Sequence, residues 1–129
     1  MDRAGGGEGM SGFTAVLQGL RHLDGVLGVV VLDKAGEVVA EDLETSVRLE
    51  VMLSHLRKFI PSLEDLAEEL EVGQVERHHV VLDDKQLVIE NLADGAVLAV
   101  YTVSDGSNLG RIRLEIRKNR KNMEAALKA

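Results

Sequence analysis

The sequence predicts an α/β sandwich in which helices cover both faces of a five-stranded, largely antiparallel sheet. Two runs, 26–32 and 96–103, are apolar at nearly every position, which is typical of interior strands buried on both faces. Three other segments place apolar residues at three- and four-residue steps and therefore predict helices. The predicted order is helix, two strands, helix, three strands, helix. A chain of 129 residues suits a single domain of this kind.

The first helix is predicted over 11–23 from its helical spacing of Phe13, Val16, Leu17, Leu20 and Leu23. The glycine-rich residues 1–10 are expected to form a flexible tail, so that the domain spans 11–129. The interior strand 26–32 turns through "DKAG", where Gly36 suits a positive φ, into the strand "EVVAEDL". This second strand is shorter and more acidic, which predicts an edge position.

The longest helix is predicted over 46–71, with Thr45 or Ser46 as its N-cap. Its apolar side is expected to face the sheet and consists of Leu49, Met52, Leu56, Phe59, Leu63, Leu66 and Leu70. Pro61 lies within this pattern, although a proline in a helix interior costs about 3 kcal/mol. Because the apolar spacing continues across Pro61, one kinked helix is favoured over two separate helices.

Three strands and a helix complete the predicted fold. Turns lead from "QVERHHVVLD" to "LVIENLA" and then to the apolar "AVLAVYTV". If the two apolar strands are interior, the strand over 74–83 is left at the other edge of the sheet. The last helix follows "SDGSN", with Ser107 or Asn108 as its cap, and it carries seven of the 15 lysines and arginines of the chain.

Composition argues against several classes of function. Zero cysteines exclude disulfides and thiol catalysis, and they are typical of a reducing compartment. The net charge of -7 and the aromatic content of 2% both argue against a nucleic-acid partner. The apolar runs are shorter than the roughly 20 residues of a membrane span, and no apolar signal segment begins the chain. We therefore expect a cytoplasmic protein without a membrane span.

Glycines and histidines form no convincing ligand site in the sequence. Gly7, Gly9 and Gly12 match a dinucleotide-binding pattern, but no strand precedes them to fix the loop. His78 and His79 are neighbours in a strand, so they point to opposite faces and cannot share a metal within one protomer. We expect these histidines to lie on a polar surface, with a cluster across a dimer axis as the remaining alternative.

Acidic pairs occur at Glu68-Glu69 and Asp83-Asp84, where the sequence indicates no enclosing pocket that would tune them for acid–base chemistry. We therefore expect no catalytic residues, no cofactor and no metal site. The protein is predicted not to be an enzyme.

Two surfaces are candidates for protein contacts. The side of the long helix opposite its apolar seam is predicted to bind a partner and contains Val47, Val51, Ser54, His55, Lys58 and Ser62. The edge strand is predicted to pair with a second copy and contains Val75, Arg77, His78, His79, Val80, Val81 and Leu82. Such pairing satisfies the free backbone groups of both edges in a closed two-fold dimer.

The layout resembles the roadblock/LC7 family. Three segments carry the resemblance: "GVLGVVVLDKAGEVVAEDL", "ETSVRLEVMLSHLRKFIPSLEDLAEELEVGQVERHHVVL" and "DGAVLAVYTVSDGSNLGRIRLEIRKN". Gly36 in the first turn and Leu109-Gly110 at the opening of the last helix stand where that family has them. Pro61 in the middle helix departs from the pattern.

The resemblance implies a homodimer joined through its third strands, with the two middle helices antiparallel on one side. Such a platform is implied to bind Ras-like small GTPases, as adaptor or as regulator of GTP hydrolysis. A structural scaffold subunit of a larger signalling or motor complex, without effect on nucleotide turnover, is the alternative. A small-ligand sensor with a pocket inside the protomer is a third interpretation, and the aliphatic core argues against it.

Overall fold

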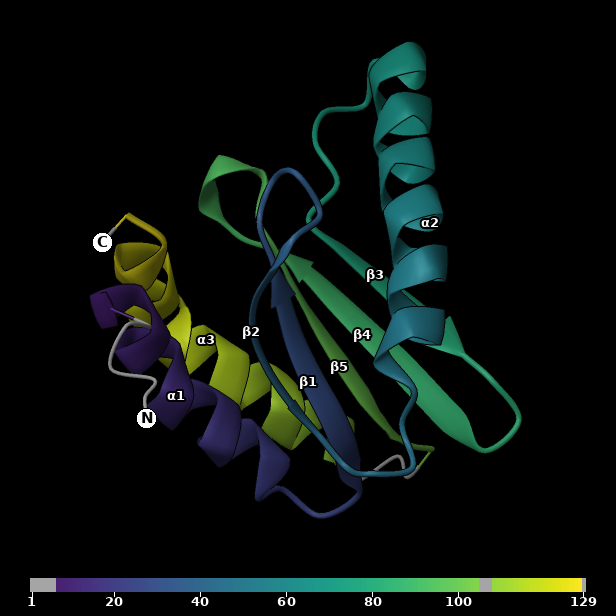
Figure 1. Cartoon of the computed structure of the whole chain (residues 1–129). Coiled ribbons are helices and arrows are strands. Elements are labelled where there is room, and N and C mark those ends of the chain that lie inside the picture. Colours follow the sequence, from purple (N-terminus) through teal and green to yellow (C-terminus); the bar gives the residue numbers. More distant parts are fainter. Residues whose placement is uncertain (1–6, 105–107, 129) are drawn as a thin grey trace.

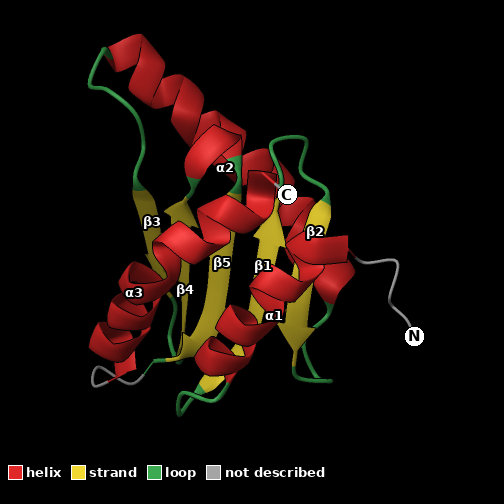
Figure 2. Ribbon diagram, turned by 90° about the vertical axis from the view of Figure 1, so that its left-hand side faces the viewer, coloured by secondary structure: helices red, strands yellow, loops and turns green. Residues whose placement is uncertain are grey.

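The computed structural model describes residues 7–104 and 108–128, and its elements form two helical layers around one sheet (Figure 1). The strands are β1 (Val26–Leu32), β2 (Val38–Leu43), β3 (Arg77–Val81), β4 (Lys85–Asn91) and β5 (Val97–Val103). Helix α2 (Leu49–Leu70) covers one face of the sheet, and α1 (Gly7–Arg21) and α3 (Asn108–Lys128) cover the other (Figure 2). The predicted fold class is confirmed.

All strand pairs are antiparallel, and the strand order is β2-β1-β5-β4-β3. The two apolar strands, β1 and β5, are interior neighbours, with Val30 opposite Ala99. Strands β2 and β3 form the two edges, as predicted. The β2 edge is acidic and irregular: Glu41 is exposed, Arg21 of α1 binds Asp42 at 3.2 Å, and the register shifts between Val31 and Leu32 of β1.

Alternation along the interior strands divides the core into two layers. The layer under α1 and α3 is built from Phe13, Leu20, Val29, Val31, Leu98, Val100, Ile112 and Met123. The layer under α2 is smaller and contains Val30, Leu32, Leu53, Leu56, Ile60, Ile89 and Ala99. α1 and α3 approach closely at Gly12, where an added Cβ would lie 2.6 Å from Cβ of Ala126.

The boundaries of the helices differ from the sequence prediction. α1 begins at Gly7, four residues before the predicted start, and residues 1–6 of the predicted tail lie outside the described ranges. Ser107 and most of the "SDGSN" loop also lie outside them. Asn108 begins α3 and donates to the carbonyl of Asp24 and to Oγ1 of Thr102. No helix in the described part of the chain is long and apolar enough to cross a membrane.

The start of α2 was predicted incorrectly. The helix begins at Leu49, and its N-cap residue, Arg48, makes no side-chain capping bond. Thr45 and Ser46 lie in a turn held by Glu44, whose side chain accepts a hydrogen bond from the backbone of Ser46 at 3.1 Å. Hydrogen bonding from the side chain of Ser46, and secondly from its backbone, lowers the pKa of Glu44. The two residues that the sequence had suggested as helix caps therefore belong to the turn before α2.

α2 is one continuous helix across Pro61, as predicted. It ends where Glu71 adopts a left-handed conformation at φ 56°, followed by Gly73 at φ +95°. Its final turns extend beyond the end of the sheet (Figure 1). The C-terminal part of the helix consequently has no strand beneath it among the residues that the structure describes (Figure 1).

This overhang corrects the predicted apolar seam. The buried residues of α2 are Leu53, Leu56 and Ile60, of which only Leu56 belongs to the predicted seam, whereas Leu66 is 51% exposed and Leu70 is 60% exposed. Phe59, on the flank of the helix, is also exposed, at 36%. The side of α2 that faces the sheet is therefore shifted from the predicted seam, and the sheet covers only the N-terminal part of the helix.

Candidate protein-interaction site

An apolar groove runs between α2 and the strands β3 and β4. It consists of two adjoining cavities of about 440 Å³ each, which share His55, Leu56, Val80 and Leu87. The remaining apolar lining consists of Leu27, Val47, Val51, Met52, Phe59, Leu63, Leu82 and Tyr101. We call this feature the α2–β3 groove. It opens beside the edge strand.

The residues predicted to bind a partner divide into two groups. Val51, His55, Lys58 and Ser62 lie on α2 and line the α2–β3 groove, with Val51 42% exposed. Ser54 is exposed but does not line the groove, and its hydroxyl donates to the carbonyl of Val51 at 2.9 Å.

The placement of Val47 on the outer face of the helix was wrong. Val47 precedes α2, is half-buried, and reaches the groove from the bend where the chain enters the helix. Its backbone donates to the carbonyl of Glu44 at 2.9 Å, so the turn positions it. The late start of α2 explains the difference.

The predicted edge strand is shorter in the structure. β3 spans Arg77–Val81, so Val75 and Leu82 lie outside it. Val75 belongs to the connector after α2, where its carbonyl accepts a hydrogen bond from the side chain of Asn91. Leu82 closes the next turn by donating to the carbonyl of Lys85 at 2.8 Å. The outer side of β3 pairs with no strand among the described residues.

Alternation along β3 separates its side chains into two sets. His78 lies opposite Ile89 and Val80 opposite Leu87, so these two face the layer under α2. Arg77, His79 and Val81 face the side of α1 and α3, where Val81 is 64% exposed. The edge thus carries exposed apolar surface on one side and borders the α2–β3 groove on the other.

His78 is buried, contrary to the predicted polar surface. It is 7% exposed, and neither ring nitrogen has a hydrogen-bond partner among the described residues. The ring of Phe59 lies above it, with centroids 5.5 Å apart and planes tilted by 55°. Burial lowers the pKa of His78, and the carboxylate of Glu64 partly opposes this shift. The sequence showed that His78 shares a face with Val80, but not that Phe59 covers it.

His79 lies on the opposite face of β3 and differs from His78 in exposure and in hydrogen bonding. It is exposed, and its Nε2 lies 2.6 Å from Oε1 of Gln86. In the described ranges, no three His, Asp or Glu side chains are grouped closely enough to hold a metal ion.

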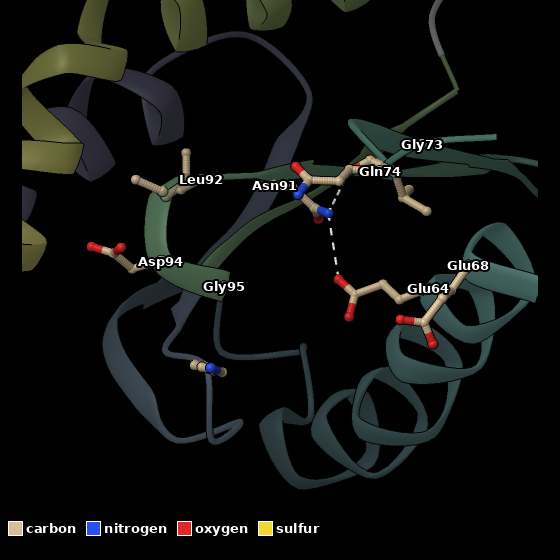
Figure 3. A pocket seen from close by; sticks show the side chains of 11 residues that line it. Glu64, Glu68, Gly73, Gln74, Asn91, Leu92, Asp94 and Gly95 are labelled. Carbon is tan, nitrogen blue, oxygen red and sulfur yellow. Dashed lines mark hydrogen bonds between the residues drawn. The ribbon is translucent and has the colours of Figure 1, made fainter. Parts of the chain in front are cut away.

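A second cavity, of about 730 Å³, lies under the overhanging end of α2 (Figure 3). Glu64 and Glu68 line it from the helix, Asp94 from the β4–β5 connection, and Lys34 from the β1–β2 turn. Asn91 crosses the cavity, since its amide donates to Glu64 at 3.5 Å (Figure 3). Glu68 borders this cavity but is itself exposed, so the cavity does not enclose it.

The outer side of α3 is a further charged surface, separated from the groove by the sheet (Figure 2). The helix carries seven basic residues and two glutamates. Arg111, Arg117 and Lys121 are exposed around Leu114, which is itself 52% exposed.

The element order, the sheet and the single long helix define an α/β sandwich of the α-β-β-α-β-β-β-α type. The family model "Roadblock/LC7 domain" matches residues 13–102. The chain belongs to this family. No curated protein matches the sequence.

Solved structures of the same fold include two bacterial MglB proteins. MglB of Myxococcus xanthus is 18% identical, with a TM-score of 0.81, and the match covers 92% of this chain and 89% of that one. The gliding protein MglB of Thermus thermophilus is 15% identical, with a TM-score of 0.77 and coverages of 93% and 91%. A structure described as MglB with a tetrameric arrangement is 14% identical, with a TM-score of 0.78 and coverages of 93% and 90%.

Proposed function

We propose that the protein is a homodimeric adaptor that binds a Ras-like small GTPase through its paired α2 helices and regulates GTP hydrolysis by that partner. The observation that carries the proposal is the unpaired edge of β3 lying directly beside the apolar α2–β3 groove. Membership of the Roadblock/LC7 family supports it, because the resemblance implies both self-association and GTPase binding.

Pairing of two β3 edges explains the first half of the proposal. An exposed edge offers a row of free N–H and C=O groups, and an antiparallel partner strand satisfies them. A two-fold axis brings the same strand of a second copy into this position. The five residues of β3 are nevertheless too few for a stable interface, which buries about 1,200–2,000 Å² in total. The helices must therefore supply most of the contact.

The exposed apolar residues of α2 provide that contact. A two-fold axis beside β3 places the α2 helices of the two copies antiparallel and adjacent. Leu66 and Leu70, which extend past the end of their own sheet, then face the N-terminal part of the partner helix, where Val47 and Val51 border the groove. Burial of such apolar surface contributes about 25 cal/mol for each Å². The overhang of α2 is then part of the dimer.

The GTPase would bind the outer side of the paired helices, where Ser54, Lys58 and Ser62 are exposed. We infer a conformational mechanism in which contact with this side holds the switch segments of the GTPase in a catalytic arrangement. The catalytic groups then belong to the GTPase, and the adaptor contributes rigid helices. This assignment treats the protein as a non-enzymatic regulator that acts in the cytoplasm.

A scaffold subunit is the second candidate, and the basic side of α3 favours it. That surface lies across the sheet from α2, so it remains accessible when the α2 platform is occupied (Figure 2). A dimer would present two such surfaces. Persistent binding of partners that are not GTPases, sensitive to charge reversal on α3, would support this role instead.

The test begins with size exclusion and light scattering, which should give the mass of two chains. Binding to purified Ras-like GTPases is then measured with GDP and with a non-hydrolysable GTP analogue, followed by turnover of GTP. Val51→Glu should abolish binding or dimerisation, whereas the matched control Leu114→Glu, at an exposed leucine on α3, should retain both. A monomer at micromolar concentration, or binding that ignores the nucleotide, would contradict the proposal.

A further inference from the structure

His78 is the point at which the edge strand meets α2. Its ring packs against Phe59 of α2 with a centroid distance of 5.5 Å, while its backbone belongs to β3. The buried hydrophobic residues of the layer under α2 come from α2, β1, β4 and β5, and β3 adds Val80 at the groove. The contact between His78 and Phe59 therefore connects β3 to the helix that covers the rest of the sheet.

The surroundings of His78 favour a neutral ring. Both ring nitrogens lack a hydrogen-bond partner among the described residues, and the side chain is 7% exposed. β4 presents the apolar Ile89 opposite it, and Val80 is its apolar neighbour on the same face of β3. Both ring nitrogens are shielded from solvent and no acceptor among the described residues reaches them, so a charge on this ring is costly in its apolar environment.

Few charged groups face His78. From α2, the carboxylate of Glu64 acts on it and favours protonation, but burial has the larger and opposite effect. His55, one turn before Phe59, lines the neighbouring part of the groove and is exposed. Glu76, which precedes β3, is also exposed. None of these groups is hydrogen-bonded to the ring in the described structure.

We propose that neutral His78 is the positioning residue that holds edge strand β3 against α2, and that its protonation separates the two and weakens the homodimer. The inference rests on the proposed dimer, because β3 and the flank of α2 are its two contact surfaces. When the ring of His78 is protonated, it moves out of the apolar site beneath Phe59 and into water. The edge strand then loses its support, and the α2–β3 groove no longer has a fixed shape.

The direction of the pH effect follows from linkage. In the closed form the ring of His78 is buried beneath Phe59 and binds a proton poorly. In the open form the ring is in water and binds a proton with the ordinary histidine pKa of about 6.5, so a lower pH shifts the equilibrium toward the open form. The stabilisation that His78 gives to the contact between β3 and α2 is complete above that pKa. It is lost as pH falls through the lowered pKa of the closed form. Because each dimer contains two copies of His78, the dissociation constant is expected to rise as pH falls, by at most about 100-fold per pH unit.

The experiment measures the dimer dissociation constant by sedimentation between pH 8 and pH 5. His78→Leu removes the titrating ring but keeps an apolar side chain beneath Phe59, so dimerisation of this variant should become nearly independent of pH. His22→Gln, at an exposed histidine directly after α1 on the other side of the sheet, is the control and should retain the pH dependence of the wild type. A His78→Leu variant with unchanged pH dependence would overturn the inference, and so would a wild-type dimer that is equally tight at pH 5.

Two further measurements cover the cases in which the His78→Leu variant fails to fold or the wild-type protein is monomeric. If His78→Leu fails to fold, His78→Gln, which is polar but does not titrate, takes its place with the same expectation. If wild-type protein is monomeric at pH 8, the proposed dimer is wrong, and NMR titration of the histidine rings then decides the inference. A ring of His78 that titrates at an ordinary pKa, without change in the signals of Phe59, would refute it.

Discussion

Arg77 and Glu90 lie opposite one another on β3 and β4, and Nε of Arg77 is 2.7 Å from Oε2 of Glu90. The side chain of Glu90 is 5% exposed, and Arg120 of α3 binds its other oxygen at 3.3 Å. Hydrogen bonding to Glu90 raises the pKa of Arg77, so this guanidinium remains charged. One buried carboxylate thus fastens the edge strand both to its neighbour and to α3.

Glu90→Gln should lower the free energy of unfolding by about 2 kcal/mol. A hydrogen bond to a charged group contributes about 1.5–3 kcal/mol, and an amide retains only part of two such bonds. Urea unfolding at fixed protein concentration, followed by circular dichroism, measures the change. The control is Glu76→Gln, at an exposed acid near the same strand, which should change stability by less than about 0.5 kcal/mol. Equal midpoints for the two variants would contradict the assigned role of Glu90.

Val81→Lys should weaken dimerisation at least about tenfold without unfolding the protomer. The side chain is 64% exposed at the open edge, so the protomer tolerates a lysine there, whereas a charge on an edge strand opposes pairing with another strand. Sedimentation gives the dissociation constant, and thermal unfolding checks the protomer. Leu114→Lys, at a similarly exposed position on α3, serves as the control and should leave the dimer intact. If both variants dimerise like the wild type, β3 is not the interface.

Pro61→Ala should stabilise the protein by about 2 kcal/mol. A proline in a helix interior costs about 3 kcal/mol, and the greater freedom of alanine in the unfolded chain offsets about 0.4–1 kcal/mol of the gain. α2 is already continuous across this residue, so the new backbone N–H can join the helix. Thermal unfolding measures the effect, with Ser62→Ala as a neighbouring exposed control. A lower melting temperature for Pro61→Ala would show that the proline shapes α2 in a way the fold requires.

Substitution by alanine at Gly36 and at Gly110 should change the stability of the protein in opposite directions. Gly36 has φ +85° in the β1–β2 turn, so Gly36→Ala should destabilise by about 1–2 kcal/mol. Gly110 lies in α3 with no atom within 4 Å of an added Cβ, so Gly110→Ala should stabilise by about 0.5–1 kcal/mol. Denaturant unfolding of the pair provides its own internal control. Changes of the same sign would refute this explanation of the two positions.

The fold was largely predictable because its signals are local. Apolar runs marked β1 and β5, helical spacing marked all three helices, and Gly36 marked the first turn. The position of β3 at an edge followed by elimination, once β1 and β5 were taken as interior strands. Each of these inferences needs only the period of a segment and its neighbours in the chain.

The site was less predictable because it depends on how far one element extends over another. Helical spacing placed Leu56, Leu66 and Leu70 on one side of α2, but of these only Leu56 is buried, because the sheet ends before it reaches the other two. Strand alternation placed His78 beside Val80, but only the packing of Phe59 above it makes it a buried group. Val47 lies before α2 and not on it, because the turn held by Glu44 makes the helix begin later than predicted.

The two edge strands of the sheet, β2 and β3, differ in whether they can pair with a further strand. Along β2, acidic side chains, a register shift and the salt bridge from Arg21 to Asp42 make further extension unfavourable. A sheet that can grow along β3 alone uses up its single open border when one copy joins another. In the proposed dimer, association would then end at a discrete pair, and the backbone pairing that drives amyloid growth would be limited to a single interface.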